Sequence, residues 1–237
     1  MKKVFFAATL LFTGLSLAAC SSAKTEQSPL DKIKEKGTLV VATSPDYAPF
    51  EFQTLVEGKN EVVGSDILLA QKLADELGVE LEISTMNFDN VLNSVQNGKA
   101  DLAIAGLSVS PEREKVFDFS DPYYQDGNVL LVQKGDVAKY AKVADLDNAD
   151  LAVQKGTTQE TYARANLSNA NIVSLTLMGE AVNQLKNGQV KAIILDSSVA
   201  SGYMSQNPDL ALAELTFEAE PENAKAIAMA KAASENQ

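Results

Sequence analysis

Charged and aromatic residues follow the ends of predicted strands at several points in this sequence. Arg113 lies at the start of a predicted helix, after the turn-like stretch 106–110, and Asp196 ends another predicted strand. Tyr47 and Phe88 follow two further strands. One cation, one anion and two aromatic rings would together suit a small zwitterion, because each charge of the ligand would meet its opposite.

Each of these residues also has an ordinary structural explanation. Arg113 could be a solvated helix residue, which is the usual place of arginine. Asp196 could merely cap the helix that follows it, since aspartate favours that position, and Thr158 could do the same. Tyr47 and Phe88 could be core aromatics. Taken singly, each residue favours the structural explanation, and only the combination points to ligand binding.

The composition excludes several classes of function. The sequence contains no histidine, which removes Ser-His-Asp and Cys-His nucleophile systems and histidine-based metal sites. It has no P-loop or dinucleotide-binding glycine pattern, and its net charge of −12 argues against nucleic acid. Paired carboxylates could still perform acid–base chemistry, but the acidic residues fall mostly on predicted helix faces. We therefore expect no metal and no cofactor.

The elements that must position these residues alternate between strand and helix. A strand over 38–44 is followed by a helix over 65–78, a strand over 79–84, a helix over 90–98 and a strand over 100–106. Gly78 stops the first helix. This order predicts an α/β fold with a mostly parallel sheet flanked by helices.

The same order recurs between residues 150 and 196. Asn97-Gly98 and Asn187-Gly188 each end an amphipathic helix and lead into a buried strand. The repeated pattern predicts two similar α/β lobes rather than one long sheet. Since ligands of open α/β sheets bind beyond the carboxyl ends of the strands, the strand-end residues of both lobes would line one cleft.

The lobes are assigned from this repeat. We expect the first to comprise residues 37–127 plus 220–237, and the second residues 128–219. The strand-like segment 128–135 is a candidate crossing between them, and the chain would return near 216–231. Two crossings would allow the lobes to hinge.

The N-terminus has the layout of an export signal. A basic start precedes an apolar run that is shorter than the roughly 20 residues of a spanning helix, so residues 1–19 are predicted to be a signal peptide. Cys20, the only cysteine, resembles the lipobox cysteine of bacterial lipoproteins. The alternative is an ordinary signal with an incidental cysteine. On the lipoprotein interpretation, Cys20 anchors the chain to the outer face of the cell membrane, and residues 20–36 form a flexible tether.

Four stretches resemble the solute-binding proteins of bacterial polar amino-acid ABC importers: "GTLVVATSPDYAPFEF", "GKADLAIAGLSVSPEREKVFDFSDPYY", "QKGTTQETY" and "LDSSVASGY". The similarity extends over nearly everything from Gly37 to Lys231. It implies the two-lobed periplasmic-binding-protein (Venus flytrap) fold, whose lobes close over one free amino acid. It also implies a monomer that delivers this ligand to a membrane permease.

The resemblance further implies roles for individual residues. Arg113 would pair with the ligand α-carboxylate, because its planar fork forms two parallel, charge-assisted bonds. Backbone N–H groups of Ser108 and Thr158 would complete carboxylate binding, the latter at a helix N-terminus. Asp196 would accept hydrogen bonds from the α-ammonium, together with the carbonyl of Gly106.

The side-chain preference of the ligand is less clearly implied. Tyr47 and Phe88 would enclose the ligand side chain, and two aromatic walls suit a guanidinium or an aliphatic stem. "GTTQETY" resembles the branch that binds basic amino acids. Ser44, however, occupies a place where some of those relatives have an aspartate. We expect arginine or lysine ahead of glutamine or another polar amino acid.

Two other functions occur on similar folds. An enzyme, such as a dehydratase or a cell-wall lyase, would need a catalytic acid or base in the cleft, where the strand-end turns supply only Asp46 and Asp196. A sensory module signalling to a kinase would normally need a spanning helix or a fused domain.

Because the strand-end turns offer so few candidate acids or bases, we expect a binding protein rather than an enzyme.

The resemblance also raises an expectation about the C-terminus. Family members continue past the strand that matches 224–231 into a helical segment on the first lobe, whereas here only "AASENQ" follows. We expect a chain that is shortened relative to its relatives. Ile227 and Met229, or their neighbours, would then meet water, although burying such a side chain is worth about 1.5–3 kcal/mol.

Overall fold

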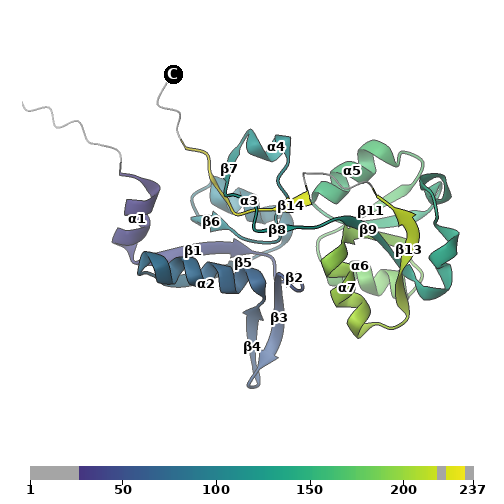
Figure 1. Ribbon diagram of the computed structural model, residues 1–237, viewed down its shortest axis with the longest axis horizontal. Helices are drawn as coiled ribbons and strands as arrows, with labels where there is room; N and C mark the ends of the chain where they lie inside the picture. Colours follow the sequence, from purple (N-terminus) through teal and green to yellow (C-terminus); the bar gives the residue numbers. More distant parts are fainter. Residues whose placement is uncertain (1–26, 218–222, 233–237) are drawn as a thin grey trace, which may run out of the picture.

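The chain forms two lobes, each built on a five-stranded sheet with helices packed against it (Figure 1). The computed structural model describes residues 27–217 and 223–232. The predicted signal peptide 1–19, Cys20 and residues 233–237 lie outside the described residues. The prediction of a two-lobed α/β fold is confirmed.

The described residues of the first lobe form a main sheet, a smaller three-stranded sheet and four helices. Its main sheet has the order β5-β1-β6-β15-β7. The main strands are β1 (Thr38–Thr43), β5 (Glu80–Thr85), β6 (Leu102–Ala103), β7 (Phe117–Phe119) and β15 (Ala228–Ala230). The smaller sheet contains β2 (Asp46–Tyr47), β3 (Glu51–Val56) and β4 (Lys59–Val63), and a separate pair joins β8 (Tyr124–Gln125) to β14 (Ala224–Lys225). The helices are α1 (Pro29–Lys36), α2 (Ser65–Leu77), α3 (Phe88–Gln96) and α4 (Pro111–Glu114).

The second lobe has the sheet order β11-β10-β12-β9-β13. Its strands are β9 (Asn128–Gln133), β10 (Asp150–Gln154), β11 (Asn171–Leu175), β12 (Ala192–Asp196) and β13 (Leu210–Thr216). Its helices are α5 (Thr158–Asn166), α6 (Met178–Lys186) and α7 (Ser197–Gln206), with the 3-10 segments η1 (Lys134–Lys139) and η2 (Val143–Leu146).

The two main sheets share one pattern of pairing. Three neighbouring strands are parallel in each: β5, β1 and β6 in the first, and β11, β10 and β12 in the second. One strand in each sheet runs antiparallel to both of its neighbours: β15, which returns from the second lobe, lies between β6 and β7, and β9, which enters the second lobe, lies between β12 and β13. Each lobe therefore combines the predicted βαβαβ unit with two further strands, of which the sequence pattern indicated β9 and β15 but not β7 and β13.

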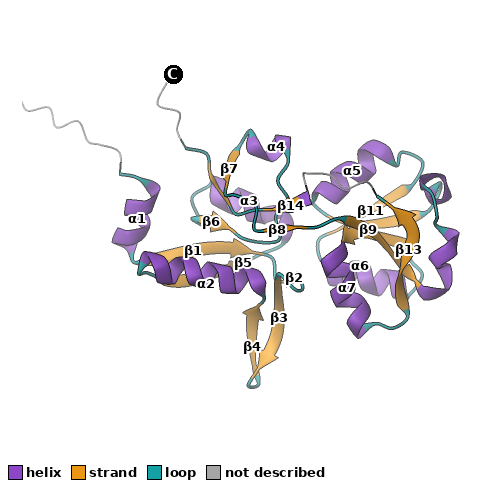
Figure 2. Ribbon diagram, viewed as in Figure 1, coloured by secondary structure: helices purple, strands orange, loops and turns teal. Residues whose placement is uncertain are grey.

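Helices cover both faces of the second sheet, with α5 on one side and α6 and α7 on the other (Figure 2). The side chains of β12 show why both faces need a cover, since successive side chains of a strand point to opposite faces of the sheet. Ile193 and Leu195 pack with α6 and α7, whereas Ala192 and Ile194 pack with α5. All four are fully buried, which explains the continuous apolar run in the sequence.

The crossing between the lobes lies earlier in the chain than 128–135. Those residues begin with β9, which pairs with both β12 and β13 inside the second sheet. The crossing is instead the short link Asp126-Gly127 between β8 and β9. Asp126 holds this link to α7 by accepting hydrogen bonds from the hydroxyls of Ser197 and Ser198. The return crossing includes residues 218–222, which lie outside the described residues.

The prediction of a flexible tether over residues 20–36 is wrong for the last eight of these residues, which form α1. The Ser28 side chain caps the helix by accepting from the backbone N–H of Asp31 at 3.1 Å. Pro29 occupies the first turn, where its missing N–H costs nothing. Gly37 ends the helix with φ 73°. Ile33 is the buried residue of α1 and packs against α2 and the first sheet.

The prediction that side chains of residues 224–231 would be exposed to water is wrong for Ile227. Ile227 is 8% exposed and packs on the α1 and α2 side of the first sheet. Ala228 is fully buried on the other side, against α3. Met229 is half-buried, and exposure begins at Ala230. The first lobe therefore covers the chain on both sides at Ile227 and Ala228, and cover decreases toward the end of β15.

No helix within 27–217 or 223–232 combines the length and the apolarity needed to cross a membrane. The same described ranges contain no group of three cysteine, aspartate or glutamate side chains that could hold a metal ion.

A pair of buried carboxyl groups lies in the first lobe. Glu51 is fully buried, and neither of its oxygens has a hydrogen-bond partner among the described residues. Asp66 is 1% exposed and accepts from the backbone N–H of Gly106 at 2.7 Å and the hydroxyl of Tyr123 at 2.8 Å. Burial, and then the nearby charge of Asp66, raise the pKa of Glu51 well above its ordinary 4.5.

We expect Glu51 to make the protein less stable as the pH rises. A carboxyl with a raised pKa binds its proton more tightly in the folded state, so its stabilising effect is complete below pH 4.5 and is lost as the pH rises through the folded pKa. The raised pKa values of Asp46 and Asp66, each caused mainly by burial, act in the same direction. The lowered pKa values of Asp126 and Glu160 act in the opposite direction: their stabilising effect is complete above the ordinary pKa values of these groups and is lost as the pH falls through the folded values.

Glu51→Gln should therefore reduce the fall in melting temperature between about pH 5 and about pH 8. Glutamine keeps the shape of the protonated acid and cannot ionise. The matched control is Glu82→Gln, which changes an exposed glutamate on β5. Identical pH profiles for Glu51→Gln and the control would show that Glu51 does not determine the pH dependence.

Candidate functional site

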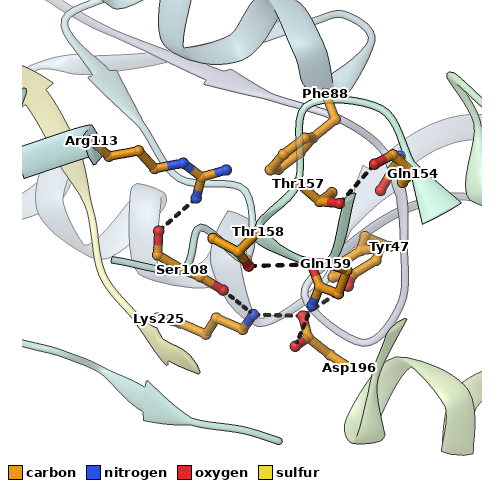
Figure 3. Close-up of a pocket in the computed structure, with 11 residues that line it drawn as sticks. Tyr47, Phe88, Ser108, Arg113, Gln154, Thr157, Thr158, Gln159, Asp196 and Lys225 are labelled. Carbon is orange, nitrogen blue, oxygen red and sulfur yellow. Dashed lines mark hydrogen bonds and ion pairs between the residues drawn. The ribbon is translucent and has the colours of Figure 1, made fainter. Parts of the chain in front are cut away.

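A pocket lies where the two lobes meet, beyond the carboxyl ends of their parallel strands (Figure 3). Its lining residues come from both lobes: Tyr47, Phe88, Gly106, Ser108, Arg113, Gln154, Thr157, Thr158, Gln159, Asp196 and Lys225. The structure thus brings together seven of the eight residues named from the sequence. Their individual roles in binding remain predictions.

Ser44 is the exception among the predicted residues. It is 1% exposed, and its hydroxyl donates to Asp46 at 3.1 Å. It lines a neighbouring hollow with Asp46, Met86 and Leu177. The turn after β1 directs Ser44 away from the pocket, so the expected contact with the ligand side chain is not supported.

Arg113 reaches the pocket from the first turn of α4. Ser110 caps this helix by accepting from the backbone N–H of Arg113 at 3.3 Å. The guanidinium then donates to the carbonyl of Ser108 at 2.5 Å and, across the lobes, to that of Gly156 at 3.0 Å. It also lies 5.8 Å from the centre of the Phe88 ring, a cation–π distance.

The charge of Arg113 is not neutralised by a direct partner. No carboxylate in the described part of the chain forms an ion pair with it. Burial lowers the pKa of Arg113 to about 10, partly opposed by the charge of Asp196. A partly desolvated guanidinium with remaining N–H groups is well suited to bind a carboxylate.

Asp196 ends β12 and is 1% exposed. It occupies the N-cap position of α7, but its side chain makes no capping hydrogen bond, so capping does not explain its orientation. Its carboxylate instead accepts from the hydroxyl of Tyr47 at 2.7 Å, from Nε2 of Gln159 at 3.0 Å and from Nζ of Lys225 at 2.5 Å. Burial and the adjacent Asp196 charge raise the pKa of Tyr47, which keeps its proton.

The N-terminus of α5 forms another wall. The Thr157 hydroxyl accepts from the backbone N–H of Glu160 at 3.1 Å and donates to the carbonyl of Gln154 at 2.7 Å. Thr158 and Gln159 begin the helix beside the pocket (Figure 3). The partial positive charge of a helix N-terminus favours an anion at this position.

Gly156 permits close contact between the lobes in front of this helix. Its φ is +82°, and an added Cβ would lie 3.1 Å from Cα of Asp89 in the first lobe. Lys155 pairs with the same aspartate at 2.9 Å. Asp46 provides a further connection by accepting from the backbone N–H of Met178, the first residue of α6, at 2.7 Å. Several polar contacts therefore join the lobes around the pocket.

Four lining residues were not among the predicted ones: Gln154, Thr157, Gln159 and Lys225. Thr157 lies in a strand-end turn that the sheet argument places at the cleft, although the sequence analysis gave this residue no role in binding. Lys225 is the single charge in the small apolar stretch 224–230. A lysine there is a recognisable signal, because a fully buried lysine needs a partner. The two glutamines carry no comparable signal in the sequence.

Comparison with known proteins yields similar chains over most of this length. A crystal structure of the amino acid ABC transporter substrate-binding protein AbpA from Streptococcus pneumoniae, bound to L-arginine, is 55% identical; it covers 85% of this chain and 84% of its own, with a TM-score of 0.83. A probable histidine-binding protein of Campylobacter jejuni is 35% identical over 210 residues, 89% of this chain and 80% of the relative.

An enzyme is also among the similar proteins. A cyclohexadienyl dehydratase of Pseudomonas aeruginosa is 31% identical over 198 residues, which is 83% of this chain and 73% of the relative. The model of the bacterial extracellular solute-binding proteins, family 3, matches residues 39–195, more than half of the 237 residues. Together with the two-lobed fold and the pocket between the lobes, these similarities identify the chain as a member of family 3 of the bacterial extracellular solute-binding proteins.

Proposed function

We propose that this protein binds a free basic L-amino acid, L-arginine first, between its lobes and delivers it to the permease of an ABC importer. One observation carries the proposal: the guanidinium of Arg113 and the carboxylate of Asp196 come from different lobes and line the same pocket. A zwitterion bridging the two would favour the closed arrangement, because it binds both charges only when the lobes meet.

The surroundings of the pocket support a basic side chain. Nε2 of Gln154 donates to the carboxylate of the half-buried Asp46 at 3.2 Å, which places an acidic group directly behind the pocket wall. The Phe88 and Tyr47 rings supply flat surfaces for a guanidinium. The arginine-bound relative from Streptococcus pneumoniae and the probable histidine-binding relative support the same ligand class.

Calorimetric titration with each of the twenty amino acids tests this proposal. We expect the tightest binding with L-arginine or another basic amino acid. Binding restricted to acidic or large apolar amino acids would contradict it. The dehydratase relative provides the rival hypothesis, so the substrate of that enzyme is included in a turnover assay. Turnover without amino-acid binding would establish the enzyme instead.

The proposed export and lipid anchoring are tested separately through Cys20. We expect Cys20→Ser to release the protein from the membrane fraction, because a single sulfur would carry the attached lipid. Fractionation followed by immunoblotting measures the distribution, and Ser21→Ala serves as a control beside the proposed cleavage site. A variant that is processed and still retained in the membrane would contradict the anchor.

A further inference from the structure

Lys225 lies where the ligand ammonium would be bound. Its side chain is fully buried and extends from β14 of the first lobe toward Asp196 of the second (Figure 3). Nζ lies 2.5 Å from Oδ2 of Asp196 and donates to the hydroxyl of Ser108 at 2.8 Å. Lys225 and Asp196 each expose 1% of their side chain.

The carboxylate of Asp196 already accepts hydrogen bonds at both of its oxygens. Tyr47 and Lys225 donate to Oδ2, and Gln159 donates to Oδ1. The single negative charge of Asp196 is balanced by the ammonium of Lys225. A second ammonium at this carboxylate would therefore meet a like charge at close range in a buried place, which is unfavourable.

We propose that Lys225 is an internal competitor for the ligand's α-ammonium, and thereby sets how strongly this site selects amino acids over carboxylates that lack the α-amine. This inference rests on the proposed function. In the unmodified protein the α-ammonium gains Asp196 only by displacing the ammonium of Lys225. Binding through Arg113 is not subject to this competition, because the carboxylate of the ligand does not compete with Lys225.

The surrounding structure allows such a displacement. The backbone of Lys225 is fixed, since β14 pairs with β8 and a bridge joins Lys225 to Ser108. The long side chain can nevertheless change rotamer. Against the effect of burial, hydrogen bonds from Ser197 and Ser198 and, to a smaller extent, the charge of Lys225 lower the pKa of Asp126. The Asp126 carboxylate offers a displaced ammonium an alternative partner at the crossing.

Calorimetry with Lys225→Met tests the inference, using L-arginine and its deaminated analogue 5-guanidinopentanoic acid. Methionine keeps the unbranched shape and removes the charge. We expect the variant to bind L-arginine at least about tenfold more tightly, a scale set by about 1.4 kcal/mol per tenfold, and the analogue no more tightly than before. The control is Lys231→Met, near the end of the same segment, whose exposed amine pairs with Asp118. It should change neither affinity.

A second variant addresses folding, because Lys225→Met leaves Asp196 buried without its counter-charge. Lys225→Gln retains a hydrogen-bond donor and should show the same direction of change. Combining either substitution with Asp196→Asn should abolish the gain, since the competition needs the carboxylate.

The outcomes separate the two proposals. Unchanged or weaker L-arginine binding in folded Lys225 variants overturns the competition while leaving amino-acid binding intact. If neither the unmodified protein nor the variants bind any of the twenty amino acids, the proposed function itself fails, and the inference fails with it.

Discussion

Arg113→Ala should weaken the binding of L-arginine by several hundredfold while leaving the fold intact. Removing one partner of a buried charge pair costs about 3–5 kcal/mol, and each 1.4 kcal/mol is about tenfold in affinity. The guanidinium is already positioned by the carbonyls of Ser108 and Gly156. It therefore needs little reorganisation when a carboxylate binds, and its loss should affect affinity almost fully.

Two further substitutions sharpen this experiment. Arg113→Lys keeps the charge but not the planar fork, so it should recover only part of the affinity. Arg164→Ala removes an exposed arginine of α5 that pairs with Glu160 on the same helix, and it should leave binding unchanged. A loss of less than about tenfold on calorimetric titration of Arg113→Ala would contradict the carboxylate role.

Asp196→Asn should reduce the affinity for L-arginine by about a hundredfold or more, the scale of a buried charge pair. The same substitution should affect 5-guanidinopentanoic acid much less, because this analogue has no α-ammonium. Asparagine can still accept from Tyr47 and differs mainly in charge. The ratio of the two losses, measured by calorimetry, isolates the contribution of the ammonium from general damage to the pocket.

The control for this ratio is Asp209→Asn, an exposed aspartate that lies 3.9 Å from Lys186 in the same lobe. It should change neither affinity. If Asp196→Asn weakened the affinities for L-arginine and for the analogue equally, Asp196 would support the structure without binding the ammonium. Asp196→Asn should also lower the melting temperature, since Lys225 would remain buried without a counter-charge.

The contacts around Asp46 make the pocket dependent on closure. Asp46 of the first lobe accepts from the first backbone N–H of α6, and the hydroxyl of Tyr203 donates to its carbonyl at 3.1 Å. Tyr47 packs among the buried side chains of the second lobe, including Met178 and Val199. A ligand that bridges Arg113 and Asp196 would add to contacts that the lobes already make with each other.

The sequence by itself determined the βαβαβ order within each lobe and most of the residues that line the pocket. Local patterns carry this information, because apolar periodicity distinguishes strand from helix, and glycine or asparagine ends α2, α3 and α6. Once each lobe is known to be a βαβαβ unit, the carboxyl ends of its strands must lie along one edge. Gly106, Ser108, Thr158 and Asp196 follow directly, and the Ser110 cap places Arg113 beside them.

Only the tertiary structure decided which side chains reach the ligand position from elsewhere. Ser44 lies close to the pocket in the sequence, but the turn after β1 directs its hydroxyl to the carboxylate of Asp46 instead. The segment 128–135 reads as a strand under either interpretation, and only pairing with β12 and β13 places β9 inside the second sheet. Strand pairing between distant segments depends on the whole chain, and a local window contains no information about it.

Lys225 shows the same limit most clearly. Its strand contacts parts of the first lobe that lie far away in the sequence. Lys225, for example, bonds to Ser108, which precedes it by 117 residues. The sequence marks the lysine as unusual in a small apolar strand but does not specify where its ammonium lies. That position follows from the closure of one lobe on the other, which brings Asp196 within 2.5 Å and leaves the buried charge no closer partner.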